Sequence, residues 1–266
     1  MGLDLCNASD VGSVLASTSG THLANGVGNA YGPYVQIVAS TATDCCWVIV
    51  HITFDGGQTG TSTGAIKIAI GAAGSEKDVV VDLQHWTNAL GASPYTFPLN
   101  IPAGTRISVA GASGAIGGAS HMTVKFALLD GGFTQIEGAS GLDSIGYDAT
   151  NIQGTPVTPG ATASTKGSYS QLVASTTRDY IGFVLVIDNQ NNTGGGGVYA
   201  WDIAIGAGGS EQIIVPNFFM LISGISNVPS GPFWINIPAG TRISARNQKN
   251  ASSAAAAGVT LYGIYQ

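Results

Sequence analysis

The residue types that could do chemistry are sparse. None of the four histidines has a counterpart in the second half of the chain: His22, His51, His85 and His121. Their spacing contains neither the His-x-His nor the His-Glu-x-x-His pattern that would indicate a metal site. Asp55, His85 and Ser93 supply the residue types of a hydrolase triad, but a Ser-rich chain offers such sets by chance, and the Gly-x-Ser-x-Gly motif is absent. We therefore expect no catalytic centre, no metal and no cofactor.

Two other patterns could be taken for chemical sites, but their residues argue against it. The glycines at 194–197 are followed by neither Lys-Ser nor Lys-Thr, so they predict a hairpin loop and not a phosphate-binding loop. The three cysteines are Cys6 and the adjacent pair Cys45 and Cys46. An odd and sparse set is not a disulfide framework, so we expect free, buried thiols in a protein made in a reducing cytoplasm.

Composition narrows the classes of protein further. Only 9% of the 266 residues are charged, against about a quarter in an ordinary soluble protein. The net charge is −6 and no Lys or Arg cluster occurs, which disfavours nucleic-acid binding. No run of 18 apolar residues predicts a membrane span, and the first residues lack the pattern of a signal peptide. A weakly charged surface is typical of a protein that spends its life inside an assembly.

The strongest feature of the sequence is an internal repeat. The eight residues Ile-Pro-Ala-Gly-Thr-Arg-Ile-Ser at 101–108 recur unchanged at 237–244. Ile-Ala-Ile-Gly at 68–71, followed by Gly-Ser-Glu at 74–76, returns at 203–206 and 209–211. Val-Ala-Ser-Thr at 38–41, with Asp44, returns at 173–176 with Asp179. The nearly constant offset indicates one domain written twice.

Hydrophobic alternation within each copy predicts strands and no helix. Residues of alternating apolar character at 46–54, 66–70 and 122–128 are separated by Gly- and Pro-rich turns, as in a sandwich or barrel. We expect an all-β protein of two tandem jelly-roll-like antiparallel β-sandwiches related by internal duplication, with an immunoglobulin-like sandwich as the alternative. The expected divisions are an N-terminal arm (1–33), a first sandwich (34–130), a linker and arm (131–168) and a second sandwich (169–266).

The retained charges are the best candidates for specific contacts. Arg106 and Arg242 recur at one position of the repeat, and Glu76 and Glu211 at another. Because a guanidinium can hold a carboxylate through two hydrogen bonds, we expect an Arg106–Glu76 and an Arg242–Glu211 ion pair at one pole of each sandwich. The alternative is four independent loop charges.

One aromatic residue stands out as a surface contact. Trp86 lies in a segment, residues 85–88, that looks like a loop, so it is the best candidate for an exposed contact with a ligand. Trp201, at the place that Ile66 occupies in the first copy, belongs to the core. For Trp86 we still favour packing or an interface over ligand binding.

The repeated motifs also support a resemblance. Gln-Ile/Leu-Val-Ala-Ser-Thr with a following Asp, Ile-Ala-Ile-Gly-Ala-x-Gly-Ser-Glu, and the eight-residue repeat resemble structural proteins of tailed bacteriophages, over roughly 34–130 and 169–266. The resemblance implies a non-enzymatic virion component, assembled in the bacterial cytoplasm and associated with the tail (fibre, baseplate or adaptor) or decorating the head.

The expected partners follow from that resemblance and from the repeat. They are other virion proteins and further copies of the chain, since a ring of three chains would present six similar units. The alternative function is a carbohydrate-binding, lectin-like module that attaches to a host glycan. An enzyme is a distant third.

Overall fold

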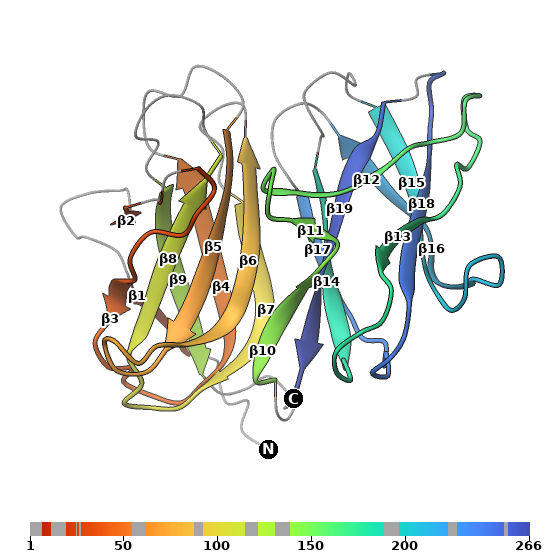
Figure 1. The fold of residues 1–266 in the computed structure, drawn as a ribbon. Coiled ribbons are helices and arrows are strands. Elements are labelled where there is room, and N and C mark those ends of the chain that lie inside the picture. Colours follow the sequence, from red (N-terminus) through yellow and green to blue (C-terminus); the bar gives the residue numbers. More distant parts are fainter. Residues whose placement is uncertain are drawn as a thin grey trace.

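The computed structural model describes residues 7–11, 20–24, 26, 28–54, 62–87, 93–114, 122–130, 139–188, 197–222, 228–252 and 255–266. Every regular element in these ranges is a β-strand, and the strands form two sandwiches that stand next to each other (Figure 1). All but one of the strand pairs are antiparallel, so the expected all-β, antiparallel fold class is confirmed. No helix in these ranges is long and apolar enough to cross a membrane.

The first sandwich contains strands β1 to β9. One of its sheets joins the two N-terminal strands to β9, then β4, then β7: β1 (Asn7–Val11), β2 (Thr21–Leu23), β9 (Met122–Asp130), β4 (Cys45–Phe54) and β7 (Ser93–Ile101). The facing strands run in the order β3 (Val35–Val38), β8 (Ile107–Ser113), β5 (Ser62–Ile70) and β6 (Lys77–Thr87).

The second sandwich repeats this arrangement with strands β10 and β12 to β19. One side has β10 (Gly141–Ile145) and β12 (Gln153–Val157) next to β19 (Ala257–Tyr265), then β14 (Gly182–Asp188) and β17 (Val228–Phe233). The facing sheet runs β13 (Ser170–Val173), β18 (Ile243–Lys249), β15 (Gly197–Ile205) and β16 (Gln212–Ile222). The short β11 (Tyr147–Asp148) pairs with β12.

This strand order is that of a jelly roll, in which the chain alternates between two four-stranded antiparallel sheets. In each unit the first strand pairs with the last, and the last pairs with the third-last of the same sheet, as two interlocked Greek keys require. The alternating apolar residues face the space between the sheets, which is why Val48, Val50 and Ile52 of β4 are completely buried.

The registers of the β5–β6 and β15–β16 pairs agree residue by residue. Ile66 pairs with Leu83, and Trp201 pairs with Phe218, each 135 positions later. Both ladders are irregular at the same two places, after Ile66 and Ile68 in the first unit and after Trp201 and Ile203 in the second. These registers define equivalent positions, which we use below to compare the two sandwiches.

The expected arm and linker prove to contain strands. β1 pairs Asn7 with Asp130, and β10 pairs Gly141 with Tyr265, so Asn7 is equivalent to Gly141. Short Gly- and Ser-rich strands carry too little alternation to be recognised, because their neighbours supply most of the apolar contact.

A single sheet runs through both sandwiches. Leu142 of β10 pairs in parallel with Val80 of β6, which joins the outer strand of the first unit to the first strand of the second. The side of the second unit formed by β10, β19 and β14 thereby packs against the first, and Val184, Val186, Tyr262 and Ile264 belong to the same apolar cluster as the first core. A second cluster lies inside the second sandwich, around Trp201.

Candidate functional site: an exposed face of the second sandwich

The four retained charges are brought together in pairs. Arg106 Nη1 donates to Glu76 Oε1 at 3.1 Å and to the Gly71 carbonyl at 3.2 Å, while Nε donates to Gln36 Oε1 at 3.0 Å. In the second unit, Arg242 makes the corresponding bonds to Glu211 at 3.3 Å, Gly206 at 3.0 Å and Gln171 at 3.0 Å. Gln36 and Gln171 were not among the expected contacts, and each gives its arginine a third hydrogen-bond partner.

The rest of the repeat also acts at this pole of each sandwich. Asp44 Oδ1 accepts a hydrogen bond from the Ala103 amide at 2.7 Å, and Asp179 does the same for Ala239 at 2.7 Å. The pKa of Glu76 lies below its ordinary value, first because its own backbone amide donates to the carboxylate and then because Arg106 does. The pKa of Glu211 is lowered as well, and its first cause is likewise the hydrogen bond from its own backbone amide. The retained residues therefore hold turns and strand ends together.

Trp86 belongs to a strand and not to a loop. It lies in β6, opposite Thr63 of β5, because β6 continues through His85 to Thr87. The loop-like appearance of residues 85–88 in the sequence was therefore misleading. The Trp86 side chain lies outside the described part of the structure.

Of the residues considered for a catalytic triad, the structure describes the side chain of His85 but not those of Asp55 and Ser93. His85 is fully buried against Phe54, with ring centroids 5.2 Å apart, and burial lowers its pKa to about 3. Asp55 and His121 lie outside the described residues, as do 194–196. No group of three His, Cys, Asp or Glu side chains in the described ranges is arranged to hold a metal ion. Cys45 is buried and Cys46 half-buried, and both are free thiols.

A buried polar cluster joins the two sandwiches. Gln84 of β6 donates its backbone amide to the Tyr262 hydroxyl at 2.9 Å, and its side-chain oxygen accepts from Thr260 at 3.0 Å. Its side-chain nitrogen donates to Asp188, which also accepts from the Gly154 amide at 2.7 Å. Burial raises the pKa of Asp188 above its ordinary value. We call this cluster, together with the β6–β10 pair, the junction.

The position equivalent to Gln84 in the second sandwich is exposed. Gln84 pairs with Ala65, and Phe219 pairs with Ala200, so Phe219 of β16 takes the place of Gln84. Gln84 has no exposed surface, whereas the Phe219 side chain is 70% exposed and Leu221 62%. Val198 of β15, which pairs with Leu221, and Ile213 of β16 are also exposed, and we call these four residues the β16 patch.

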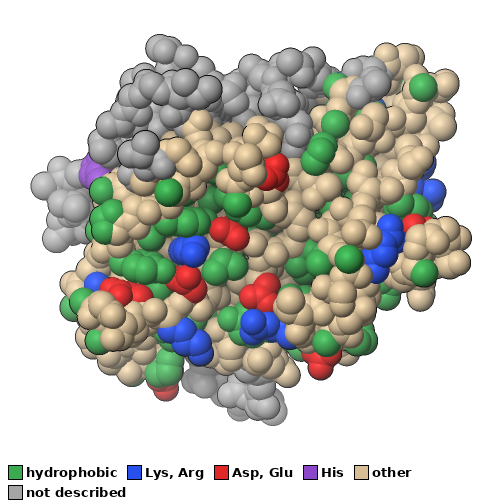
Figure 2. All heavy atoms as spheres, in the orientation of Figure 1, with side chains coloured by type: hydrophobic (Ala, Val, Ile, Leu, Met, Phe, Trp, Pro, Cys, Tyr) green, Lys and Arg blue, Asp and Glu red, His purple; other side chains and the backbone are tan. Residues whose placement is uncertain are grey.

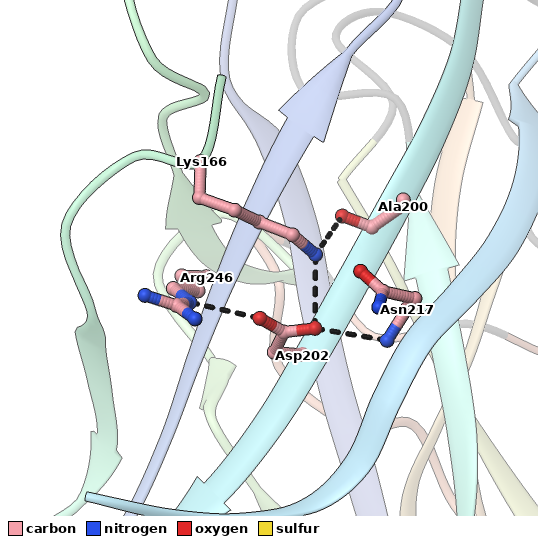
Figure 3. A network of polar contacts seen from close by, with 5 residues as sticks. All are labelled: Lys166, Ala200, Asp202, Asn217 and Arg246. Atoms are coloured by element: carbon pink, nitrogen blue, oxygen red, sulfur yellow. Dashed lines mark hydrogen bonds and ion pairs between the residues drawn. The ribbon is translucent and has the colours of Figure 1, made fainter. Parts of the chain in front are cut away.

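Next to the β16 patch lies a network of charges (Figure 3). Asp202 of β15 accepts from Lys166 Nζ at 2.9 Å, from Arg246 Nε at 2.8 Å and from the Asn217 amide at 2.8 Å. Burial acts to raise the pKa of Asp202, but these three donors outweigh it and the pKa is lowered. Lys166 also donates to the Ala200 carbonyl, so the network links β15, β16 and β18 next to the patch.

The surface around these features carries few charges. On the face seen in Figure 2, Lys, Arg, Asp and Glu side chains are scattered singly or in pairs among apolar and uncharged groups. Near the base of the junction a groove of about 250 Å³ is lined mainly by polar side chains. Within it, Arg178 Nε lies 2.9 Å from Asp143 Oδ2, and the Tyr180 hydroxyl donates to the same carboxylate at 3.1 Å.

No family model matches the chain, and no curated protein matches it. Solved structures give distant likenesses. The structure of PNGF-II is 10% identical with a TM-score of 0.43, over 97% of this chain. The CBM22-1-CBM22-2 tandem domain of Paenibacillus barcinonensis Xyn10C is 7% identical with a TM-score of 0.29, over 98% of this chain and 91% of that one.

A third likeness is to the fucolectin from Morone saxatilis (striped bass) serum, which is 11% identical with a TM-score of 0.22, over 98% of this chain and 96% of the lectin. The match to PNGF-II covers 65% of that chain. Identities and scores this low do not transfer a function.

Proposed function

We propose that this chain is a non-enzymatic structural protein that docks to a protein partner through the β16 patch. The observation that carries the proposal is the exposure of Phe219 and Leu221 on a strand whose counterpart in the first sandwich is covered. Fully burying a Phe or Leu side chain stabilises by about 1.5–3 kcal/mol, so two of them supply a substantial contact. The low charge density of the chain suits extensive burial in an assembly.

The proposed assembly is the virion of a tailed bacteriophage, where the chain would belong to the tail or decorate the head. The support for this setting is the resemblance of the repeated motifs to phage structural proteins. A double jelly roll with a weakly charged surface is suited to such a role.

The proposal is tested on virus particles whose genome encodes the chain. An antibody against the chain should label the particles at a fixed position in negative-stain images. A Phe219→Glu/Leu221→Glu variant should be at least tenfold less incorporated, because two carboxylates would have to be buried at the contact. Ala42→Glu/Ala73→Glu is the matched control, since it adds the same charge at two exposed turns of the first sandwich. Unlabelled particles would refute the virion role.

A second candidate function is carbohydrate binding, and the polar groove favours it. Carboxylate, guanidinium and hydroxyl groups converge there at Asp143, Arg178 and Tyr180, and such groups hydrogen-bond sugar hydroxyls. The Arg178 guanidinium stacks on the Tyr265 ring, 4.1 Å from its centroid, which helps to hold the guanidinium in place at the groove.

A glycan array distinguishes the two functions. Selective binding that is lost in Arg178→Ala but kept in Phe219→Glu/Leu221→Glu would establish a lectin site in the groove. Loss in Trp86→Ala instead would place the site on β6, where the sequence first suggested one. Absence of binding across the array would leave the structural role as the only candidate of the two.

A further inference from the structure

The junction inside the chain shows how one sandwich binds another. The second sandwich presents the outward face of its β10–β19–β14 side, and this face packs against the first sandwich beside β6. Val184, Val186, Tyr262 and Ile264 enter the first core, and Asp188 and Thr260 bond to Gln84. β7 and β17 also lie near each other. The contact is heterologous, because two different faces of one fold meet.

Each of the two faces that meet at the junction has an equivalent face elsewhere in the chain. These two equivalent faces do not contact each other. The counterpart of the β6 side is the β16 side of the second sandwich, which ends in the exposed β16 patch. The counterpart of the β10–β19–β14 face is the outward face of β1, β9 and β4 in the first sandwich. On that face Ile49, Thr53 and Ala127 are half-buried and His51 is exposed. The two unmatched faces lie in different sandwiches of the chain (Figure 1).

The side chains of the two unmatched faces differ from those of the junction in size and polarity. Registers make Phe219 equivalent to Gln84, Ala127 to Tyr262, and Thr53 to Asp188. A larger residue thus stands on one face where a smaller one stands on the other. The buried carboxyl of the junction is replaced by a neutral hydroxyl opposite the apolar Phe219. A Phe219–Ala127 contact would exchange the junction's polar bonds for apolar packing between a smaller pair of side chains than Gln84 and Tyr262.

Backbone pairing would be as limited as it is in the junction. Only Leu142 and Val80 pair between β10 and β6, and their counterparts are Ala8 of β1 and Val215 of β16. The next residue on β16 is Pro216, which has no amide hydrogen and so restricts extended strand addition at this edge. Side-chain packing around Phe219 would therefore carry the specificity.

We propose that the partner of the β16 patch is a second copy of this chain, bound head to tail, so that the contact between chains reproduces the junction within the chain. The patch on β16 is the head, and the outward face of β4 and β9 is the tail. This inference rests on the assembly role proposed above and names the partner of the same surface. Head-to-tail contacts close into a ring or continue as a filament; a ring of three chains would present six sandwiches.

Two blocked variants test the arrangement by complementation. The head variant is Phe219→Glu/Leu221→Glu and the tail variant is Ile49→Glu/His51→Glu, each measured in the full chain by mass photometry and sedimentation. The wild type should form oligomers as its concentration rises, and each variant alone should need at least tenfold more protein to do so. An equimolar mixture of the two should give a 1:1 dimer and nothing larger, because one intact head meets one intact tail.

Controls separate the possible failures. A second tail variant, His51→Glu/Thr53→Glu, leaves the half-buried Ile49 in place, and circular dichroism checks that every variant folds. If the head variant is monomeric while both tail variants oligomerise like the wild type, the interface is two-fold and the head-to-tail inference is wrong. If the wild type stays monomeric throughout but the head variant is still lost from particles, the second copy is refuted as partner and the assembly role stands.

Discussion

At the scale of single residues, charged side chains of the molecule bond to one another and hold strand ends and turns together. Arg106 and Arg242 each make three side-chain contacts that span strand ends and turns. Repetition within the sequence predicted which residues would meet, because positions kept in both copies report what the fold needs. Gln36 and Gln171 are also kept in both copies, but their uncharged side chains gave no reason to expect them as partners of the arginines.

The Asp202 network shows where repetition fails as a guide. The position equivalent to Asp202 holds Lys67, which pairs with Asp78 at 3.4 Å. The charge at this position is thus opposite in the two units, and the two residues pair with different partners. Lys166, Asp202 and Arg246 come from three separate segments, so neither spacing nor comparison of the copies could have joined them.

Substituting either arginine should weaken the fold by a similar amount. Arg106→Ala and Arg242→Ala each lose a charged hydrogen bond to a backbone carbonyl, which contributes on the order of 2 kcal/mol. Arg106→Lys should recover only part of the loss, since an ammonium cannot reach Gln36 and Gly71 as the planar fork does. Chemical denaturation measures both effects. Equal stability of the wild type and Arg106→Ala would show that the clamp is dispensable.

Acid should weaken these pairs. Because the pKa values of Glu76 and Glu211 are lowered in the fold, their contribution is present above the ordinary value of 4.5 and is lost as the pH falls through the folded value. The difference in unfolding free energy between the wild type and Glu76→Gln should therefore shrink on acidification. A difference that grows below pH 4.5 would contradict the assignment.

Asp188 should behave in the opposite way. Its folded pKa is raised, so its contribution to stability is present below the ordinary value of 3.8 and is lost as the pH rises through the folded value. Asp188→Asn keeps an acceptor for the Gly154 amide and removes the buried charge. Its melting temperature should exceed that of the wild type at pH 7, and the two should converge near pH 3. A lower melting temperature at pH 7 would show that the carboxylate itself is needed.

At the scale of elements, alternation predicted the strands whose faces are cleanly divided, such as β4, β5 and β9. It missed β1, β2, β10 and β12, which are short and rich in small or polar residues. They form because the final strand of each unit, β9 or β19, offers an unpaired edge. Such pairing is decided by tertiary context, which a local pattern does not contain.

The eight-residue repeat should respond identically in both copies to one change. Gly104 has a φ of 78° and Gly240 a φ of 81°, and a Cβ added to either would meet nothing within 4 Å. Replacement by Ala is then penalised only by backbone conformation, by about 1 kcal/mol at each site. The double variant should lose about the sum, because the sites lie in separate sandwiches. Unequal losses in urea denaturation would show that the turns are not equivalent.

At the scale of the whole molecule, the sequence indicated two separate units, whereas the structure joins them through one sheet and a shared apolar cluster. The parallel β6–β10 pair joins strands far apart in the chain, and the residues that fill the junction differ from their equivalents in the first copy. Nothing in the spacing of the repeat encodes that contact.

The shared cluster predicts cooperative unfolding. Tyr262 is fully buried, accepts from the Gln84 amide and donates to the Asp82 carbonyl, so Tyr262→Ala should destabilise the chain by about 3–5 kcal/mol. Calorimetry should show one transition moved to lower temperature. Two transitions, of which only one moves, would mean that the sandwiches unfold independently.

The most direct test of the central claim is a cryo-EM map of the wild-type chain in its assembled form. The account predicts that neighbouring chains meet as the two sandwiches do within one chain, with Phe219 of one copy against Ala127 of the next and β16 beside β1. A map in which Phe219 packs against its own symmetry mate, or in which β16 faces solvent, would contradict it.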